Sequence, residues 1–413
     1  MRLLHTSDWH LGAKLGRIDR YDDQLVALRA LIEHAENRRP DLIVHSGDVF
    51  DGSRPPYRAM ALAVKALARL SAIAPTVVLA GNHDSVALLG VLHDLAGLAA
   101  PRRLWFVTSP DVLTFVIDGQ DVALACLPFV HPNAVVDLLA VDPTAWEGTY
   151  AAAIDKVNKD LLAKARTRID PASGLLFYAA HLHVHGAKPG RSERRITVGE
   201  DYSTHTTGLE RVVYAAFGHI HDPQLLPGGA VPGRYAGALV PLDFGESAQT
   251  KQAVLVTVDA HDRWIEELPL PPGRPLVLRP GITLDALAAE AGTGALDGVI
   301  LKAVVVSDDP LPDLADRVAQ MAPRAAVFEL TNRIRNAPAR PIPTEDASGG
   351  EPALESMFRE WQATTTARRG DPARVAELFD RLMGTIGTDA APDMGVTDLV
   401  AAVDDAAAVG GQR

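Results

Sequence analysis

Short apolar runs alternate with amphipathic segments through the first two thirds of the chain. Runs of Val, Ile and Leu such as residues 42–44 have the length of buried strands. Between these runs, residues 21–37, 57–71 and 85–98 place apolar side chains at helical spacing. This alternation predicts a layered α/β domain over residues 1–268, with the faces of its sheet largely covered.

Proline marks two boundaries after this domain. Residues 269–280 contain five prolines, which predicts a domain boundary there. Beyond it, alternating strand and helix patterns predict a small α+β domain, and a second linker at 338–350 precedes two short amphipathic helices. The predicted parts are residues 1–268, residues 275–340, a helix–loop–helix at 351–387, and an Ala/Asp/Gly-rich tail at 388–413 that we expect to be flexible.

The composition is that of a globular protein, with 47% hydrophobic and 22% charged residues. No apolar run is long enough to span a membrane, and Met1-Arg2 leads into a strand without a signal peptide. The single cysteine, Cys126, excludes an intramolecular disulfide framework and suits the reducing cytoplasm. A net charge of −12 argues against a chain-wide nucleic-acid footprint, so any such binding must be local or shared with a partner.

Five of the apolar runs end in residues of the types that ligate metals. Carboxylate, imidazole and amide groups together suit Mn²⁺ or a similar hexacoordinate ion better than a structural zinc site, which would favour cysteines. Other histidines, among them His5 and His45, are interpreted as ordinary core or loop residues. The candidate ligands are Asp8, His10, Asp48, Asn82, His181, His219 and His221.

The segments that carry these residues resemble the motifs of a known superfamily. HTSDWHLG, GDVFD, GNHDS, a single later strand-end histidine and GHIH are similar to those of the calcineurin-like metallophosphoesterases. Their flanks resemble the SbcD family, the nuclease component of the SbcC–SbcD DNA repair complex. The resemblance implies a β-sandwich flanked by helices, followed by the small capping domain and the helix–loop–helix.

Carried over to this sequence, the resemblance implies two metal ions, which we expect to be Mn²⁺, with Mg²⁺ or Fe²⁺ as alternatives. It implies that His83 faces the scissile phosphate and that Asp84 orients its ring. His183 and His185 alternate with His181 and compete with it for the ligand position, and we choose His181 because it matches the placement that the family resemblance implies, directly after the strand. The two implied ligand sets are Asp8, His10, Asp48 and His221 for one ion, and Asp48, Asn82, His181 and His219 for the other.

The metal motifs predict phosphoester hydrolysis but do not select DNA over a small phosphodiester. The resemblance implies a double-strand exonuclease and a single-strand or hairpin endonuclease. A small-molecule phosphodiesterase or phosphatase and a mainly architectural DNA-end tether are the alternatives. Two basic clusters could contact DNA phosphates, although solvated surface explains them equally well. One cluster is Lys188, Arg191, Arg194 and Arg195, and the other is Arg324, Arg333, Arg335 and Arg340, of which Arg333 and Arg335 are the predicted DNA contacts.

The two C-terminal helices are too short to be stable alone, so their apolar faces must pack against something. The resemblance implies the coiled-coil base of the ATPase SbcC, and docking on the chain's own domain is the alternative. The resemblance also implies a homodimer through residues 57–71 and 85–98, hence a heterotetramer with the ATPase, although core packing explains the same apolar pattern. We expect a cytoplasmic, nucleoid-associated protein. The predicted partner contacts are Leu354, Met357, Phe358, Trp361, Leu378, Phe379, Leu382 and Met383.

Overall fold

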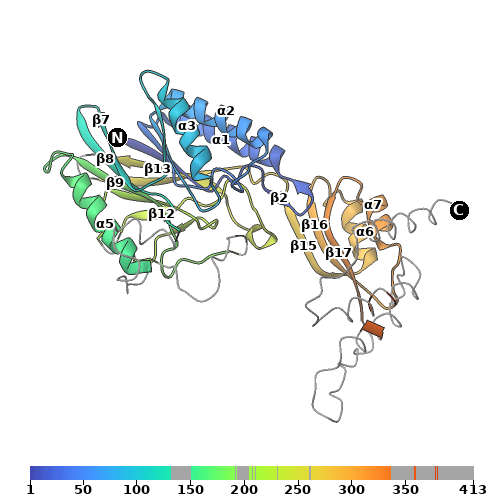
Figure 1. The fold of residues 1–413 in the computed structure, drawn as a ribbon. Coiled ribbons are helices and arrows are strands. Elements are labelled where there is room, and N and C mark those ends of the chain that lie inside the picture. The colour runs from blue at the N-terminus through green and yellow to red at the C-terminus, as the bar shows by residue number, and fades with distance from the viewer. Residues whose placement is uncertain are drawn as a thin grey trace, which may run out of the picture. The chain divides into compact units, whose positions relative to one another are not determined.

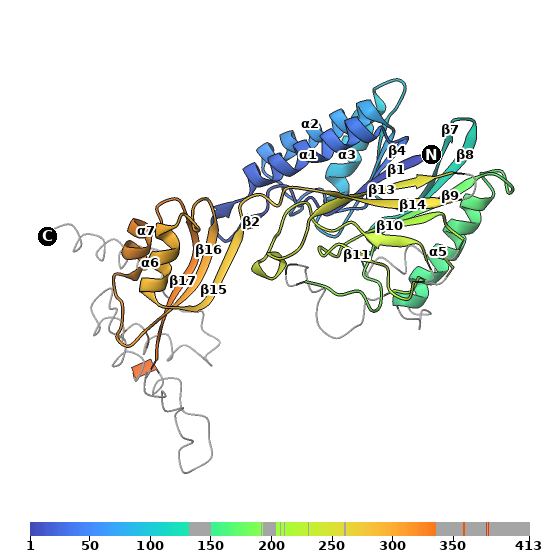
Figure 2. The same ribbon diagram turned by 180° about the vertical axis from the view of Figure 1, so that it is seen from behind.

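In the computed structural model, two six-stranded sheets pack face to face, and helices cover the outer side of each (Figure 1, and from behind in Figure 2). Residues 1–335 form one compact unit and residues 336–413 another. No helix in the described part of the chain is both long and apolar enough to cross a membrane. The structure describes residues 1–131, 150–190, 192, 204–206, 208–209, 211–229, 231–259, 262–335, 358–359, 377 and 379.

The first sheet has the strand order β14-β13-β1-β4-β5-β6. Strands β1, β4, β5 and β6 are parallel, and β13 and β14 continue the sheet in antiparallel fashion. The predicted helices at 21–37, 57–71 and 85–98 are confirmed and cover its outer face. The elements are β1 (Arg2–Thr6), α1 (Tyr21–Arg38), β4 (Leu42–His45), α2 (Tyr57–Ile73), β5 (Thr76–Leu79), α3 (Val86–Gly97), β6 (Leu104–Val107), β13 (Gln252–Val258) and β14 (Arg263–Pro269).

The second sheet has the order β11-β12-β10-β9-β8-β7, and helix α5 covers its outer face. Its four central strands are parallel, as expected where both faces of a sheet are buried. Its elements are β7 (Asp111–Ile117), β8 (Gln120–Leu127), α5 (Tyr150–Arg166), β9 (Leu175–His181), β10 (Tyr214–Gly218), β11 (Gln224–Leu225) and β12 (Gly233–Tyr235).

The inner faces of the two sheets enclose a continuous apolar core. Leu3, Val44 and Val77 from the first sheet meet Leu124 and Phe177 from the second. The layered α/β sandwich is therefore as predicted, and its strands read as apolar runs because both of their faces are buried.

A third, three-stranded parallel sheet follows, with two helices on one face. The predicted break at 269–280 is wrong at its end, because β15 begins at Leu276 and includes Pro280. Proline is tolerated there because β15 is an edge strand whose register shifts at this point. The elements are β15 (Leu276–Ile282), α6 (Leu284–Gly292), β16 (Ile300–Ser307), α7 (Leu314–Met321) and β17 (Ala326–Ile334).

The third sheet packs against two short elements that come before it in the chain. These are the hairpin of β2 (Lys14–Leu15) with β3 (Ile18–Asp19), and the 3-10 helix η3 (Phe244–Glu246). The rings of Phe244 and Phe328 have centroids 5.2 Å apart. This apolar contact explains why residues 1–335 form a single compact unit.

Candidate metal centre

The seven predicted ligands gather where five strands end. Those from β1, β4 and β5 follow the carboxyl ends of the first sheet, and those from β9 and β10 the carboxyl ends of the second. All are buried except Asn82, which is half-buried. Because the two sheets are packed with these ends together, residues more than 200 positions apart contact each other, as His219 N does when it donates to Asp8 Oδ1 at 3.1 Å.

The backbone is strained at four of these residues. Asp8, His10, Asp48 and His219 have φ angles of 49°, 45°, 58° and 97°, in the left-handed region that non-glycine residues avoid. Main-chain hydrogen bonds hold two of these turns in place, from Asp8 N to Gly47 O and from His10 N to Asp48 O. Such conformations cost about 1–3 kcal/mol each and concentrate at functional sites.

Asp48 lies at the centre of the cluster. Its Oδ2 is 3.5 Å from His10 Nε2 and 3.4 Å from His181 Nε2, while Oδ1 accepts a hydrogen bond of 2.8 Å from His83 N. One carboxylate oxygen therefore lies between imidazoles of the two implied ligand sets. From this position the carboxylate would be within reach of ions held by either set.

The other donor atoms divide around Asp48 into two groups. On one side, Asn82 Oδ1 is 2.9 Å from both His181 Nε2 and His219 Nδ1. On the other, ligand atoms of Asp8, His10 and His221 lie within 4.8 Å of one another. His83 also comes this close to His10 and Asp48. The structure thus brings all seven predicted ligands together.

The charges of the cluster favour cations. Burial alone would lower the pKa of His10 and His181, but Asp51 and Asp48 beside His10, and Asp48 beside His181, raise both pKa values to about 9. Burial would likewise raise the pKa of Asp48, yet its imidazole neighbours hold it well below its usual value. A buried carboxylate that stays ionised attracts protons to its neighbours and would attract divalent cations in the same way.

The donor set fits divalent metal ions. The buried Nε2 of His10 makes no hydrogen bond within the described protein, which is the expected state of a nitrogen reserved for a metal. The ligands offer oxygen and nitrogen, while Cys126 lies buried in β8, where burial raises the pKa of its thiol. This donor set fits divalent metal ions and lacks the cysteines that a structural zinc site would favour.

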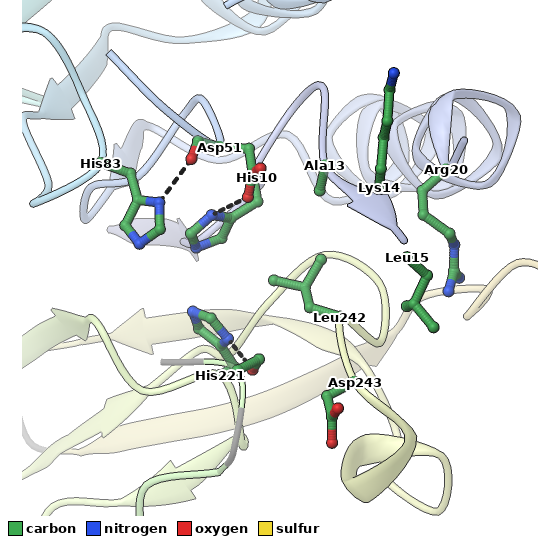
Figure 3. A pocket seen from close by; sticks show the side chains of 11 residues that line it. His10, Ala13, Lys14, Leu15, Arg20, Asp51, His83, His221, Leu242 and Asp243 are labelled. Atoms are coloured by element: carbon green, nitrogen blue, oxygen red, sulfur yellow. Dashed lines mark hydrogen bonds and ion pairs between the residues drawn. The ribbon is translucent and has the colours of Figure 1, made fainter. Parts of the chain in front are cut away.

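His83 lies beside the cluster and lines a cavity of about 200 Å³ with His10, His221 and Asp51 (Figure 3). Its Nδ1 is 2.7 Å from the carbonyl oxygen of Asp51. The orienting contact predicted for Asp84 is therefore made by the Asp51 backbone. Asp84 instead accepts hydrogen bonds from the backbone N–H groups of Val49, Phe50 and Gly81. Its buried carboxylate thereby joins the loop that follows β4 to the loop that follows β5.

The remaining candidates lie outside the cluster. The His183 ring centroid is 6.4 Å from that of His219, and His185 faces His205 at 6.0 Å. Lys188 is exposed, and its main-chain N–H and carbonyl oxygen form hydrogen bonds with the Gln224 side chain. Arg335 is also exposed and lies 3.5 Å from Asp308. Arg333 is exposed on β17. The other three predicted basic contacts, Arg191, Arg194 and Arg195, lie outside the described residues.

Two carboxylates of the site were not predicted. Asp51 Oδ1 is 3.3 Å from His10 Nδ1, and its place in GDVFD, three residues after Asp48, was the available signal. Glu246 lies behind His221, with Oε1 3.6 Å from Nδ1. No spacing rule connects Glu246 to the metal motifs, since it reaches the site only through the fold.

Comparisons with known proteins found a matching family, related sequences and solved structures. The calcineurin-like phosphoesterase family matches residues 1–223. The SbcD component of the nuclease SbcCD from Escherichia coli K12 is 27% identical over 397 residues, covering 94% of this chain and 98% of that protein. The Bacillus subtilis protein of the same name is 30% identical over 285 residues, covering 67% and 71%. A solved dimetal phosphatase from Danio rerio aligns with 66% of this chain and 96% of its own, at 11% identity and a TM-score of 0.41.

Proposed function

The chain belongs to the SbcD family of calcineurin-like phosphoesterases, and we therefore propose that it is a metal-dependent DNA nuclease working with an SbcC-type ATPase. The observation that carries the proposal is the position of Asp48 Oδ2 between the Nε2 atoms of His10 and His181. That arrangement supports a two-metal site, and similarity to the SbcD nuclease over 94% of the chain supports DNA as substrate.

We assign one ion to Asp8, His10, Asp48 and His221, and the other to Asp48, Asn82, His181 and His219. We propose Mn²⁺ as the native metal, with Mg²⁺ or Fe²⁺ as alternatives. When bound, two such ions supply an activated water and positive charge for the phosphate oxygens. The protein's part is to hold the ligands in place, which the strained turns at Asp8, His10 and Asp48 support.

His83 is proposed to act on the leaving group. Its Nδ1 faces the Asp51 carbonyl, and its other ring nitrogen points toward the gap between His10 and His221 (Figure 3). From there a protonated imidazole can donate to the sugar oxygen as the phosphorus–oxygen bond breaks.

One assay tests the activity. Mn²⁺ is offered with blunt duplex DNA, hairpin DNA and a chromogenic phosphodiester to the chain, with and without its ATPase. Duplex degradation that requires the ATPase and ATP is the expected result. Hydrolysis of the diester alone would indicate a small-molecule phosphodiesterase, and DNA binding without cleavage would indicate an architectural role.

The C-terminal helix pair is proposed to bind the ATPase, and the protein to work in the cytoplasm at the nucleoid. The rings of Phe358 and Phe379 stack with centroids 3.8 Å apart and planes within 7°, which supports packing of the two helices against each other. Deleting residues 351–413 should abolish co-purification with the ATPase and spare hydrolysis of the diester. A complex that survives the deletion would contradict the assignment. The other predicted contacts, Leu354, Met357, Trp361, Leu378, Leu382 and Met383, lie outside the described residues, as does the tail 388–413.

A homodimer through α2 and α3 is also proposed, giving a heterotetramer with the ATPase. Helix α3 is almost entirely apolar, yet Leu89 is its one buried side chain, and Val91 and Leu95 are more than half exposed. A second copy of the chain would cover this face. In light scattering, Val91→Glu with Leu95→Glu should halve the mass. Val116→Glu, at a still more exposed apolar position on β7, is the control that should leave the mass unchanged.

DNA phosphates are proposed to contact Lys188, Arg333 and Arg335, together with Arg191, Arg194 and Arg195. The exposed positions of the first three support this role. Replacing Arg333 by Ala should weaken duplex binding about equally for all sequences, because phosphate contacts carry no base information. Unchanged binding across a salt series would remove Arg333 from the set.

A further inference from the structure

A buried ion pair lies behind His221. Glu246 ends the helix η3 and Lys251 precedes β13, and each is only 1% exposed. Lys251 Nζ is 2.6 Å from Glu246 Oε2 and also donates to the carbonyl oxygen of His221 at 2.9 Å. Burying two charges costs desolvation energy that their attraction often fails to recover. Stability alone is therefore a weak explanation for placing this pair here.

The second carboxylate oxygen of Glu246 reaches His221 through a hydroxyl. Ser192 Oγ is 2.6 Å from His221 Nδ1 and donates its proton to Glu246 Oε1. With its own proton committed to the carboxylate, Ser192 Oγ accepts from Nδ1–H. This relay fixes the tautomer of His221, with the proton on Nδ1. The other ring nitrogen points toward His10 and His83 (Figure 3).

We propose that Glu246 is a positioning residue for the metal ligand His221, acting through Ser192, with Lys251 as its balancing charge. The inference rests on the metal ligands assigned under the proposed function. A carboxylate that accepts from the distal nitrogen of a ligating imidazole fixes the ring and makes it a stronger ligand. Lys251 adds a second restraint, because it holds the main-chain carbonyl of His221 as well as the carboxylate.

The two metal positions differ in this support. His10 and His221, both assigned to one ion, have carboxylates behind their Nδ1 atoms, from Asp51 and Glu246. His181, assigned to the other ion, donates Nδ1–H to the main-chain carbonyl of Ser46 at 2.8 Å. Removing the Glu246 charge should therefore weaken one metal position and leave the other unchanged.

The test measures Mn²⁺ binding by the full chain, using calorimetry and electron paramagnetic resonance. Wild type should bind two ions. In Glu246→Gln, one of the two affinities should fall about 10- to 100-fold. Ser192→Ala removes the relay without leaving a buried charge and should weaken the same position. Two unchanged affinities in both variants would overturn the inference. A wild-type chain that binds no Mn²⁺ would overturn the proposed function itself.

A double variant separates positioning from folding. Glu246→Gln leaves Lys251 as an unpaired buried charge, so the unfolding temperature of the metal-free protein should fall. Glu246→Gln with Lys251→Met removes both charges and should restore that temperature, while the weakened Mn²⁺ position stays weak. If the affinity returned together with the unfolding temperature, Glu246 would be structural only.

A matched control uses the ion pair of Lys302 and Glu329, which are 2.6 Å apart and about one third and two fifths exposed. Glu329→Gln with Lys302→Met makes the same chemical change on β16 and β17. Both Mn²⁺ affinities should stay at wild-type values. A loss here equal to that in Glu246→Gln would show that the effect is not specific to His221 and would also overturn the inference.

Discussion

Two pairs of histidines near the strand ends are at least 99% buried. Their pKa values are shifted in opposite directions. The edge pair is His10 and His181, and the other pair, called the interior pair here, is His5 within β1 and His45 at the last residue of β4. Burial disfavours the charged imidazole in all four. At the edge, carboxylates overcome burial and raise both pKa values to about 9. In the interior, burial prevails and lowers both pKa values to about 3.

The difference comes from the groups that face the rings. His5 has the Tyr214 hydroxyl 3.0 Å from Nδ1 and the Ser46 hydroxyl 2.9 Å from Nε2, so neutral partners satisfy both nitrogens. His10 and His181 share the Asp48 carboxylate. Burial alone therefore does not identify a metal-binding histidine. A buried carboxylate next to the ring raises the pKa of His10 and His181 and makes their surroundings favourable to cations.

Replacing Asp48 by Ala should reduce the difference between the edge and interior histidines more than any other substitution. Without this carboxylate both ions should be lost and hydrolysis should fall to background, because Asp48 is the ligand that the two sets share. In chelator, the pKa values of His10 and His181 should then fall, with the larger change at His181, because Asp51 and Asp8 remain beside His10. Metal analysis and an NMR titration of the imidazoles measure both effects. Two ions still bound would contradict the bridging assignment.

His83 is a third case, since it lies beside the same carboxylate but is assigned no metal. His83→Ala should keep both ions, because the main-chain N–H that bonds to Asp48 remains. Turnover should fall about 10²–10⁴-fold through loss of proton transfer to the leaving group. Counting ions and measuring diester hydrolysis on the same sample checks this. Near-native turnover would remove His83 from the mechanism.

Gly81→Ala disturbs the edge without removing a ligand. A Cβ here would lie 2.1 Å from Asp48 Oδ1 and 2.4 Å from Asp48 N, and the main chain cannot move aside. We expect a loss of about 1–3 kcal/mol in the free energy of unfolding, together with weaker Mn²⁺ binding. Urea unfolding and Mn²⁺ titration measure the two effects.

Gly292→Ala, at the end of α6, is the control for this substitution. An added Cβ there meets no atom within 4 Å. Its unfolding free energy should stay constant or rise by up to about 1 kcal/mol, with unchanged metal binding. Equal behaviour of the two variants would show that Gly81 is not required for the position of Asp48.

The residues at the strand ends could be predicted from the sequence, because apolar runs and the residues that follow them are local features. Buried strands read as runs of Val, Ile and Leu, and the metal motifs stand directly after them. The same reasoning placed α1, α2 and α3, whose apolar spacing is equally local.

Contacts between distant segments could not be predicted in this way. The hydrogen-bond partner of His5, Tyr214, is 209 positions away. Glu246 contacts His221 only because the fold brings η3 next to it. Strand β15 was missed because Pro280 argues against a strand unless its edge position is known. The hydrogen-bond partners of Asp84 could not be predicted for the same reason, since Val49 and Phe50 come from another loop.

The lowered pKa values of the interior pair predict that the free energy of unfolding depends on pH. Unfolded His5 binds a proton below about pH 6.5, whereas folded His5 binds one only near pH 3. Its contribution to stability is therefore complete above about pH 6.5 and is lost as the pH falls toward 3. Within that window one such histidine lowers the free energy of unfolding by about 1.4 kcal/mol per pH unit.

His5→Gln should remove this share of the slope, whatever it costs in hydrogen bonds at neutral pH. Urea unfolding in chelator between about pH 6.5 and pH 4 measures it, since bound metal would add its own pH dependence. His34→Gln, at a half-buried position, is the control for the substitution. If His5→Gln and wild type lost stability with the same slope, His5 would not be held neutral in the fold, and the contrast between edge and interior would then rest on His45 alone.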